Sequence, residues 1–540
     1  MRTLILSIAL LITFISTSDA QWAWVRSVGI SGFNDWQAMS VSEDGSIYVS
    51  GFSDKLGGTP PRAFVTAKYS DSGISSWSTA LLTPTPSPGV PAVASDAQGN
   101  VYTLETVGGV SNDYVQLPDK SKQEYFLDFC VVSKYFSNGT LAWCKRLTFK
   151  DYSYFGVLPN GTVCIHADNI LLKSFIFGED TIKGQGVSAF IEIGTDGNLI
   201  RAQNDQDLTP QRPGITFMQW KEPGKIFIVG SLSIYAHIYR RGIIDLDAKT
   251  ITYEGDSLVV GGPASAIFFW NNSGIPTYTT TVLDPLTNHL FAIMSSASYD
   301  SYLNDKDTLF HITNNQTMEG YVVELDENMR VVRKIQVTSP QILAVRDSQI
   351  VVVGMARAAG DYGFNTPDTT IKITRKSYNQ DGFVVYEMDR NFKYRRHGLV
   401  EHGYQNFMEL NATAIRADGS VVTSFSTSGD VYFEGMAPFH TFGSTGTTIA
   451  ALGPTHPVAA VGTEAVKETA SIYPNPASNA ITIIQPGAFT FHLTDIVGKT
   501  ISSRSATDKI TYDLPQVSSG SYFIVIETAT SREIRAIKKM

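Results

Sequence analysis

The chain has 540 residues, of which 17% are charged, 11% are aromatic and 44 are glycine. This is the composition of an ordered, β-rich chain that is long enough for several domains. The formal net charge is -9 and no block of lysine or arginine forms a basic stripe, which argues against nucleic acid as a partner.

The N-terminus has the pattern of a secretory signal peptide. Arg2 precedes an apolar run over residues 4–15, and small and polar residues follow up to Ser18-Asp19-Ala20. The run is short for a membrane-spanning helix and ends in a small-x-Ala cleavage pattern, so we predict a signal peptide over residues 1–20 and a mature start at Gln21. A membrane anchor is the alternative. No later stretch resembles a transmembrane segment, so we expect none in the mature chain.

Residues 34–52, NDWQAMSVSEDGSIYVSGF, are predicted to form a β-hairpin. Alternating runs on both sides flank Asp44-Gly45, a dipeptide that is favoured where a two-residue turn needs positive φ. Weaker copies of this hairpin recur at residues 91–106, 154–168, 217–231, 343–356 and 412–426, with a degenerate copy at 284–296.

A second pattern alternates strictly with the first and consists of an apolar run, a turn and a short strand. It occurs at residues 63–77, 129–143, 189–202, 266–278, 321–334 and 383–396. Two hairpins in each period of about 60 residues give four strands per unit, and four-stranded units repeated radially are the blades of a β-propeller. We therefore predict an all-β chain with a seven-bladed β-propeller over residues 21–453. A tandem row of β-sandwich domains is the alternative, but units of this size bury too little surface to stand alone.

The first two units also resemble a known family of repeats. Residues 44–51 read Asp-Gly-x-Ile-Tyr-Val-x-Gly, and residues 63–77 read Ala-Phe-Val-x-x-Lys-Tyr-x-x-x-Gly followed by tryptophan. Both are similar to the SBBP-type β-propeller repeats of exported bacterial proteins. The resemblance weakens in the later units, and it implies an architecture rather than an activity.

The two ends of the repeat region are predicted to complete one blade. The seventh unit stops after its third strand, at residues 447–452, whereas the other units continue with a strand after the turn. A strand of this kind stands before the first hairpin, at residues 22–28. Pairing of these two segments would leave no strand of the ring unpaired.

The repeats end near residue 453. Residues 454–470 are rich in small residues, contain Pro454 and Pro457, and are interpreted as a linker. Alternating strands separated by turn residues resume over residues 471–540 and predict a small β-sandwich of about 70 residues.

This C-terminal segment closely resembles the type A sorting domain of the type IX secretion system. The matching residues are Tyr473-Pro474-Asn475-Pro476, Leu493-Thr494-Asp495 with Gly498-Lys499, Leu514-Pro515, Gly520 with Tyr522, and the basic ending Lys538-Lys539. The resemblance implies that the domain binds the type IX secretion machinery, directs passage across the outer membrane of a Gram-negative bacterium, and is removed there. The cargo would then be secreted or attached to surface lipopolysaccharide. An unrelated β-sandwich cap is the alternative.

Three cysteines, Cys130, Cys144 and Cys164, are few for an exported chain that depends on disulfides, so a large hydrophobic core is expected to hold the fold. Cys130 and Cys144 flank a turn at residues 137–140 and form a possible disulfide. A two-residue turn there would place Cys144 opposite Ser133, however, so this pair needs a longer turn. Cys164 is another possible partner, and three buried free thiols are the alternative.

The search for chemical motifs is mostly negative. The sequence has no P-loop, GxSxG, HExxH or EF-hand pattern, so we predict no catalytic, cofactor-binding or metal-binding residues. His397 and His402 are expected to lie in a solvated loop. Two pairs of carboxylates are expected to be solvated charges rather than Ca²⁺ ligands, Asp245 with Asp247 and Asp305 with Asp307.

Tryptophan is the remaining candidate for ligand recognition. Trp77 and Trp143 follow equivalent turns and are expected to be core residues. Core positions are also favoured for Trp36, Trp220 and Trp270, with a ligand-facing loop as the alternative.

Two functions remain open. The first is a secreted or cell-surface protein without catalytic activity, whose propeller face binds a glycan, a peptide or another protein. The second is an exported hydrolase or lyase that acts on polysaccharide with residues from several blades, which would leave no local motif. The first is favoured because no unit concentrates histidine, acidic residues and arginine.

Overall fold

The structure is a computed structural model of the chain with two compact units, Met1–His456 and Pro457–Met540. The predicted signal peptide and linker lie outside the described residues. The structure describes residues 22–539 except for 29–32, 54–61, 84–90, 108–113, 117–118, 120–121, 125–128, 150, 169–173, 178–179, 184–187, 209–213, 234–237, 262–280, 296–300, 304–307, 311–318, 357–360, 366–369, 375–381, 403–407, 428, 435, 437–438, 441–445, 454–470, 474–478, 495–499, 515–516 and 529–531.

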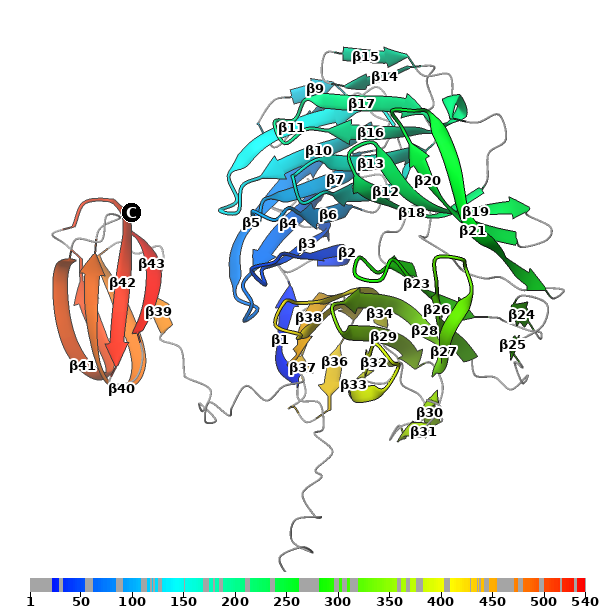
Figure 1. Ribbon diagram of the computed structural model, residues 1–540. Helices are drawn as coiled ribbons and strands as arrows, with labels where there is room; N and C mark the ends of the chain where they lie inside the picture. Colours follow the sequence, from blue (N-terminus) through cyan, green and yellow to red (C-terminus); the bar gives the residue numbers. More distant parts are fainter. Residues whose placement is uncertain are drawn as a thin grey trace, which may run out of the picture. The chain divides into compact units, whose positions relative to one another are not determined.

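Seven antiparallel sheets form the first unit, and each is built around four strands that we call a blade (Figure 1). Blade 1 contains β2 (Phe33–Val41), β3 (Ile47–Ser53), β4 (Arg62–Tyr69) and β5 (Ser75–Thr83). Blade 2 contains β6 (Ala92–Ser95), β7 (Val101–Val107), β10 (Phe129–Tyr135) and β11 (Leu141–Leu147). Blade 3 contains β12 (Asp151–Val157), β13 (Val163–Asp168), β16 (Ala189–Ile193) and β17 (Leu199–Asn204), followed by the short 3-10 helix η1 (Asp205–Asp207).

The remaining four blades repeat this order. Blade 4 contains β18 (Gly214–Glu222), β19 (Lys225–Ser233), β20 (Ile238–Asp245) and β21 (Thr250–Gly261). Blade 5 contains β22 (Thr281–Leu283), β23 (Leu290–Ser295), β26 (Glu319–Leu325) and β27 (Val331–Thr338). Blade 6 contains β28 (Pro340–Arg346), β29 (Gln349–Ala356), β32 (Gly382–Asp389) and β33 (Tyr394–His402). Blade 7 contains β34 (Met408–Ile415), β35 (Val421–Thr427), β38 (Gly446–Leu452) and β1 (Trp22–Val28).

Blade 7 therefore takes its fourth strand from the N-terminal end of the described chain. β1 pairs antiparallel with β38, with Trp22 opposite Leu452 and Val28 opposite Thr447. These are the two segments whose pairing the number of strands per unit predicted. The side chains of Trp22 and Val25 are buried in the core between blades 6 and 7.

An apolar core lies between every two neighbouring blades. Ile47 and Val49 of blade 1 pack with Ile449 and Ala451 of blade 7, so the series of cores closes on itself. The first strands of several neighbouring blades contact one another, as β2 does with β6 and β34, so these first strands lie nearest the centre. A closed ring of seven four-stranded blades is a β-propeller, and burial between the blades replaces a single central core.

The turn between the first and second strands of blade 1 differs in one respect from the prediction. Gly45 has a φ of 79°, whereas Asp44 does not have positive φ. The Gly45 N–H donates to the Ser42 carbonyl and the Ser42 N–H donates to the Ser46 carbonyl, both at 3.0 Å. This is a type I turn closed by a glycine bulge rather than a two-residue hairpin turn. The turn glycines at 99, 161, 224 and 419 also have positive φ, between 73° and 81°.

Additional hairpins connect consecutive blades. In blades 2, 3, 5, 6 and 7 the chain between the second and third strands forms a hairpin that extends the outer strand of the preceding blade. The hairpins are β8 (Tyr114–Gln116) with β9 (Lys122–Glu124), β14 (Ser174–Phe177) with β15 (Asp180–Lys183), β24 (Ser301–Leu303) with β25 (Thr308–Phe310), β30 (Asp361–Asn365) with β31 (Thr370–Thr374), and β36 (Asp430–Phe433) with β37 (Phe439–His440). They cover edges that would otherwise expose unpaired backbone groups.

The second unit is one five-stranded sheet that curls around its own core. Its strands are β39 (Ser471–Tyr473), β40 (Ala480–Thr494), β41 (Thr500–Asp513), β42 (Gly520–Thr528) and β43 (Arg532–Lys539). The long β40 pairs with β41 along one edge and with β39 and then β42 along the other. Phe491, Ile524 and Ile537 belong to the enclosed core. The expected small sandwich is thus formed by a single curled sheet.

The structure describes some residues of the predicted sorting motifs in this unit. Gly520 begins β42, and the Tyr522 hydroxyl donates to the Ser518 carbonyl at 2.8 Å. The Lys539 ammonium donates to the carbonyls of Leu514 and Val517, which anchors the end of β43. Tyr473 ends β39. Seven further motif residues lie outside the described residues, namely Pro474, Asn475, Pro476, Asp495, Gly498, Lys499 and Pro515.

None of the three cysteines forms a disulfide. Cys144 lies opposite Ser133 in the β10–β11 pair, and Cys130 lies opposite Leu147. The possible disulfide between Cys130 and Cys144 is therefore absent, because the turn does not bring the two sulfurs to facing positions. Burial raises the pKa of the Cys144 thiol to about 12.

Candidate binding pocket

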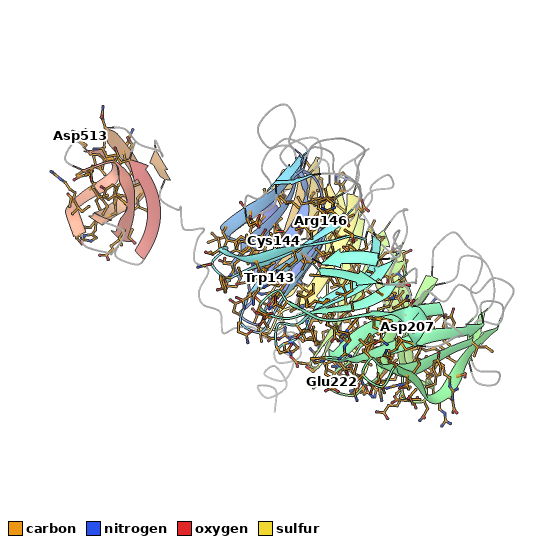
Figure 2. All side chains as sticks on the ribbon, turned by 90° about the horizontal axis from the view of Figure 1, so that it is seen from above. Trp143, Cys144, Arg146, Asp207, Glu222 and Asp513 are labelled. Atoms are coloured by element: carbon orange, nitrogen blue, oxygen red, sulfur yellow. The ribbon has the colours of Figure 1, made fainter. Side chains whose placement is uncertain are left out.

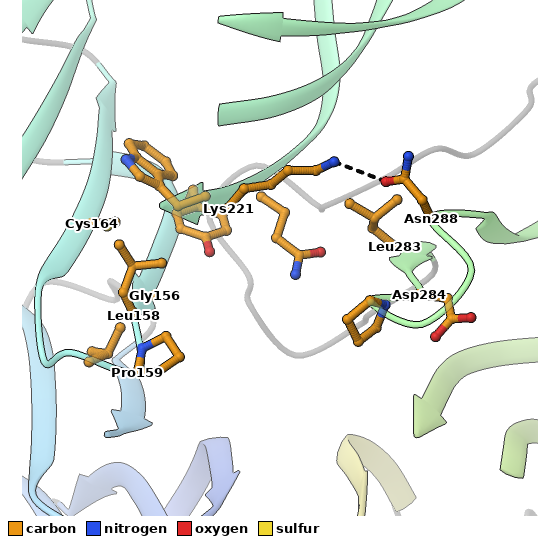
Figure 3. Close-up of a pocket in the computed structure, with 13 residues that line it drawn as sticks. Gly156, Leu158, Pro159, Cys164, Lys221, Leu283, Asp284 and Asn288 are labelled. Atoms are coloured by element: carbon orange, nitrogen blue, oxygen red, sulfur yellow. Dashed lines mark hydrogen bonds between the residues drawn. The ribbon is translucent and has the colours of Figure 1, made fainter. Parts of the chain in front are cut away.

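A cavity of about 440 Å³ lies at the inner strands of blades 3, 4 and 5, beside the turns that follow them (Figure 3). Its size is within the range of small-molecule sites. The lining comes from β12 and its turn (Tyr154, Gly156, Val157, Leu158, Pro159), from β13 (Cys164), from β18 (Gln219, Trp220, Lys221), and from β22 and its turn (Leu283, Asp284, Pro285, Asn288). We call this cavity the inner pocket.

One wall of the inner pocket is a stacked aromatic pair. The rings of Tyr154 and Trp220 lie 4.9 Å apart at 28°. The Trp220 Nε1–H donates to Glu192 Oε1 at 2.9 Å, and the Gly224 N–H donates to the same oxygen at 2.7 Å. Glu192 is buried and belongs to β16 of blade 3, so it holds blade 4 in place from the neighbouring blade. The wall is therefore rigid before any ligand binds.

The opposite rim is the turn after β22, and it is fixed by a buried ion pair. Both carboxylate oxygens of Asp284 accept hydrogen bonds from the Arg390 guanidinium, at 2.6 and 2.9 Å. The Thr287 hydroxyl and N–H also donate to Asp284. Burial raises the pKa of Asp284, but the hydrogen bonds from Arg390 and Thr287 outweigh it and hold the pKa below its usual value. Asp284 is thus an ionised structural group that has no proton to donate at neutral pH.

Lys221 is the second charged residue of the lining. Its ammonium donates to Asn288 Oδ1 at 2.9 Å across the inner pocket (Figure 3), and it lies 5.4 Å from the Phe227 ring. Asn288 has a left-handed backbone with φ of 59°. Its Nδ2–H donates to Glu327 at 3.2 Å and its carbonyl accepts from Arg241. Asn288 therefore joins blade 4 to blade 5 and positions the Lys221 ammonium.

The remaining titratable groups of the lining are not suited to acid, base or nucleophilic roles. Burial raises the pKa of the Tyr154 hydroxyl and of the Cys164 thiol well above neutrality. A thiol of this kind stays protonated and inert. The inner pocket therefore offers shape, apolar contacts and one ammonium group, but no visible proton-transfer pair among its described residues.

The equivalent turns on the other side of the ring carry paired charges. Arg346 Nη2 lies 2.5 Å from Glu43 Oε2 of blade 1, and Nη1 donates to the Ile415 carbonyl of blade 7. Gln349 donates to the Gly419 carbonyl at 3.0 Å. These contacts tie blades 6, 7 and 1 together and differ from the arrangement at Lys221.

The structure does not bring the sequence candidates for metal binding together. His397 and His402 lie on strand β33, and His402 is buried, so the expected solvated loop is wrong. Five positions separate them, so they point to opposite faces of the strand. Asp245 accepts backbone hydrogen bonds from its own turn, and Asp247 pairs with Arg201 at 2.6 Å. Asp305 and Asp307 lie outside the described residues. Among the residues that the structure describes, no three histidine, cysteine or acidic side chains form a cluster that could hold a metal ion.

The tryptophans differ in their burial and in what they contact. Trp77 and Trp143 are half-buried, pack against the apolar cores between blades, and cover turns of the next blade. Trp220 is buried and supports the inner pocket. Trp270 and the side chain of Trp36 are outside the described part of the chain.

A serine–histidine contact lies near the inner pocket but has the features of a structural contact. Ser153 Oγ lies 2.5 Å from His166 Nδ1. The imidazole is buried and packs on the Phe190 ring at 4.6 Å. A catalytic base must be accessible to the reacting group, and this imidazole is not.

Sequence reasoning missed the residues that form the inner pocket. Lys221, Asn288 and Arg390 belong to no motif, and Arg390 is 106 positions from its partner Asp284. The one available signal was the divergence of the copy at residues 284–296, whose turn Asp284-Pro285-Leu286 departs from the glycine turns of the other units.

The C-terminal unit matches a known family model, the secretion system C-terminal sorting domain, over residues 471–539. This is the C-terminal sorting domain of the type IX secretion system. The protein is therefore exported by this route, and it is secreted or located at the cell surface of a Gram-negative bacterium. No curated protein matches the chain in sequence.

Several solved structures are similar in fold. The Dos1 propeller is 10% identical with a TM-score of 0.33, over 81% of this chain and 95% of that one. A protein of unknown function from Bacteroides caccae is 13% identical with a TM-score of 0.25, over 42% and 68% of the two chains. The AtxE2 isopeptidase is 9% identical with a TM-score of 0.29, over 75% and 60%. In the described residues, no helix is long and apolar enough to cross a membrane.

Proposed function

We propose that the protein is an exported binding protein without catalytic activity, and that the inner pocket is its ligand site. The observation that carries this proposal is that contacts between blades fix the pocket walls, while its acidic, thiol and phenol groups are either committed to structural contacts or held in inert states. Asp284 is saturated by Arg390, Cys164 is a buried thiol, and Glu192 holds Trp220. A site of this kind recognises a ligand but has no group ready to transfer a proton.

Export supports the same function. A chain with a C-terminal sorting domain is delivered outside the cell, where a propeller can present a pocket to glycans, peptides or other proteins. We also propose that the repeats are of the SBBP type, on the residues of blades 1 and 2 that resemble them.

The test is to screen the purified protein on glycan and peptide arrays and to follow each hit by calorimetry. Gln219→Trp places a large ring into the inner pocket from β18. Gln98→Trp makes the same change at an exposed turn of blade 2 and serves as the control. We expect a ligand whose binding is lost in the first variant and kept in the second. Binding that is equal in both would place the ligand site elsewhere.

The alternative is a hydrolase or lyase that acts on polysaccharide. It requires carboxylates that approach each other to about 5 to 10 Å. Turnover of a polysaccharide that is abolished by one acidic substitution would establish the enzyme and overturn the binding proposal.

A further inference from the structure

We propose that the inner pocket takes a ligand with a carboxylate next to an apolar group, such as a peptide with an apolar C-terminal residue, and that Lys221 is the counterion. The inference rests on the proposed function, because it names the ligand class of the same site. Three features of the pocket carry it: the charge of its lining, the position of the ammonium group and the nature of its walls.

One positive charge of the lining has no acidic partner to compensate it. The two charged side chains of the lining are Lys221 and Asp284, and the Asp284 charge is compensated by Arg390. Lys221 has no acidic partner among the described residues, since its contacts are the neutral Asn288 amide and the Phe227 ring. In a chain of net charge -9, the pocket is therefore a local site for an anion.

The Lys221 ammonium is held in position but has free hydrogen-bonding capacity. A lysine ammonium has three N–H donors, and the contact with Asn288 Oδ1 uses one of them. Asn288 is itself fixed by Glu327 and Arg241. Two donors therefore remain for the oxygens of a bound carboxylate, and such charge-assisted hydrogen bonds are stronger than neutral ones.

The walls favour an apolar group beside the carboxylate. Leu158 and Pro159 line one side, and Leu283 and Pro285 line the other. Leu286 follows Pro285 and is 68% exposed, so the rim itself is apolar. A uronic sugar has hydroxyl groups all around its ring and would leave several unpaired against these walls. The apolar walls and rim beside the Lys221 ammonium therefore favour a ligand with an aliphatic side chain over an acidic sugar.

The test uses four probes with the purified full chain, measured by calorimetry. The probes are acetyl-Ala-Ala-Leu with a free carboxylate, the same peptide as its C-terminal amide, hexanoate, and a uronic acid oligosaccharide. We expect the free peptide to bind at least about tenfold more tightly than the amide, which is the difference expected for one charge-assisted contact. Tighter binding of the peptide than of hexanoate identifies a peptide end as the source of the carboxylate, and the reverse identifies a free acid.

Two variants complete the design. Lys221→Met keeps the length of the side chain and removes the charge, and Lys393→Met makes the same charge change at an exposed turn of blade 6. We expect the first to lower the affinity for the free peptide about tenfold and the second to leave it unchanged, with equal melting temperatures for both. Four results would overturn the proposal. They are equal binding of the free peptide and its amide, no effect of Lys221→Met, no binding of the free peptide or of hexanoate, and tighter binding of the uronic acid oligosaccharide. A neutral ligand that is lost in Gln219→Trp but kept in Lys221→Met would refute the carboxylate while leaving the binding function intact.

Discussion

The indole Nε1 of Trp24 donates a hydrogen bond of 3.1 Å to the carbonyl oxygen of Asp71, and this contact joins blade 7 to blade 1. The same contact recurs around the ring. Trp77 donates to Ser137 at 3.1 Å, and Trp143 donates to Thr195 at 2.9 Å. Each tryptophan is on the outer strand of one blade and covers the turn glycine of the next, namely Gly73, Gly139 or Gly197. Trp143 is labelled in Figure 2, on β11 beside Cys144 and Arg146.

The first prediction concerns these tryptophan-covered turns. A Cβ at Gly139 would lie 2.8 Å from the Trp77 ring, at a φ of 86°. Gly139→Ala should therefore lower the free energy of unfolding by about 2 to 4 kcal/mol, from backbone strain and overpacking together. Gly419→Ala has a similar φ of 80°, but its Cβ would meet only Gln349 at 3.6 Å, so about 1 kcal/mol is expected from strain alone. Unfolding in denaturant measures the free energy of unfolding of both variants. Equal losses in Gly139→Ala and Gly419→Ala would contradict the role of Trp77.

The repeating elements could be predicted because they depend on local signals. Gly45 marks its turn through positive φ, and the pairing of β1 with β38 follows from counting strands. The hairpins between blades depend on pairing with a distant edge, such as Leu82 with Gln116, and no local pattern specifies that partner. The inner pocket is less predictable still, because Asp284 and Arg390 come together only through the packing of blade 5 on blade 6.

The second prediction concerns the pair of Asp284 and Arg390. Asp284 is fully buried and Arg390 is 20% exposed. Arg390→Met leaves a buried carboxylate without its partner, so it should lower the free energy of unfolding by about 3 to 5 kcal/mol. The double variant with Asp284→Asn should recover part of this loss. Arg330→Met is the control, because Arg330 and Asp256 pair at 2.7 Å on the surface, where about 0 to 1 kcal/mol is expected. Similar losses in both single variants would refute the structural role of the buried pair.

The third prediction concerns the pH dependence of stability. Glu105 on β7 is 2% exposed, and burial raises its pKa to about 8. Between an unfolded pKa of about 4.3 and this value, the folded state binds one proton more than the unfolded state. The contribution of Glu105 to stability is therefore lost progressively as the pH rises through this window and is constant above it.

Glu105→Gln removes this pH-dependent contribution to stability. The variant should gain stability relative to the natural chain between pH 5 and pH 8, by up to roughly 4 kcal/mol. Glu222→Gln, at an exposed position, is the control and should not change the pH profile. Unfolding curves in denaturant at several pH values test this, and parallel profiles for all three proteins would show that Glu105 is ionised in the folded state.

The fourth prediction concerns export. The sorting domain occupies residues 471–539, so a chain that ends at Glu468 should fold its propeller but remain in the periplasm. Cell fractionation with an antibody against the propeller would detect this. A reporter fused to residues 457–540 should conversely be exported. If the truncated chain reached the medium at the normal level, the C-terminal unit would not be the signal.

The last prediction concerns closure of the ring. β1 supplies the fourth strand of blade 7, and Trp22 packs edge-on against Phe433 with ring centroids 5.1 Å apart. Deletion of residues 22–28 removes the buried side chains of Trp22 and Val25 and exposes the edge of β38. Burial of each large side chain stabilises the fold by about 1.5 to 3 kcal/mol. The melting temperature of the deletion variant should therefore fall sharply, or the protein should become insoluble.

A circular permutant separates strand pairing from the position of the chain ends. Because Trp22 lies opposite Leu452, a turn copied from residues 136–140 can join them as it joins β10 to β11, with new ends placed between β5 and β6. The covalent order then matches that of the other blades, and closure no longer depends on two separate ends meeting. This permutant should melt at or above the temperature of the natural chain, whereas the same permutant without residues 22–28 should be as unstable as the simple deletion. A deletion variant that melts like the natural chain, or a permutant that fails to fold, would refute closure of the ring through β1 and β38.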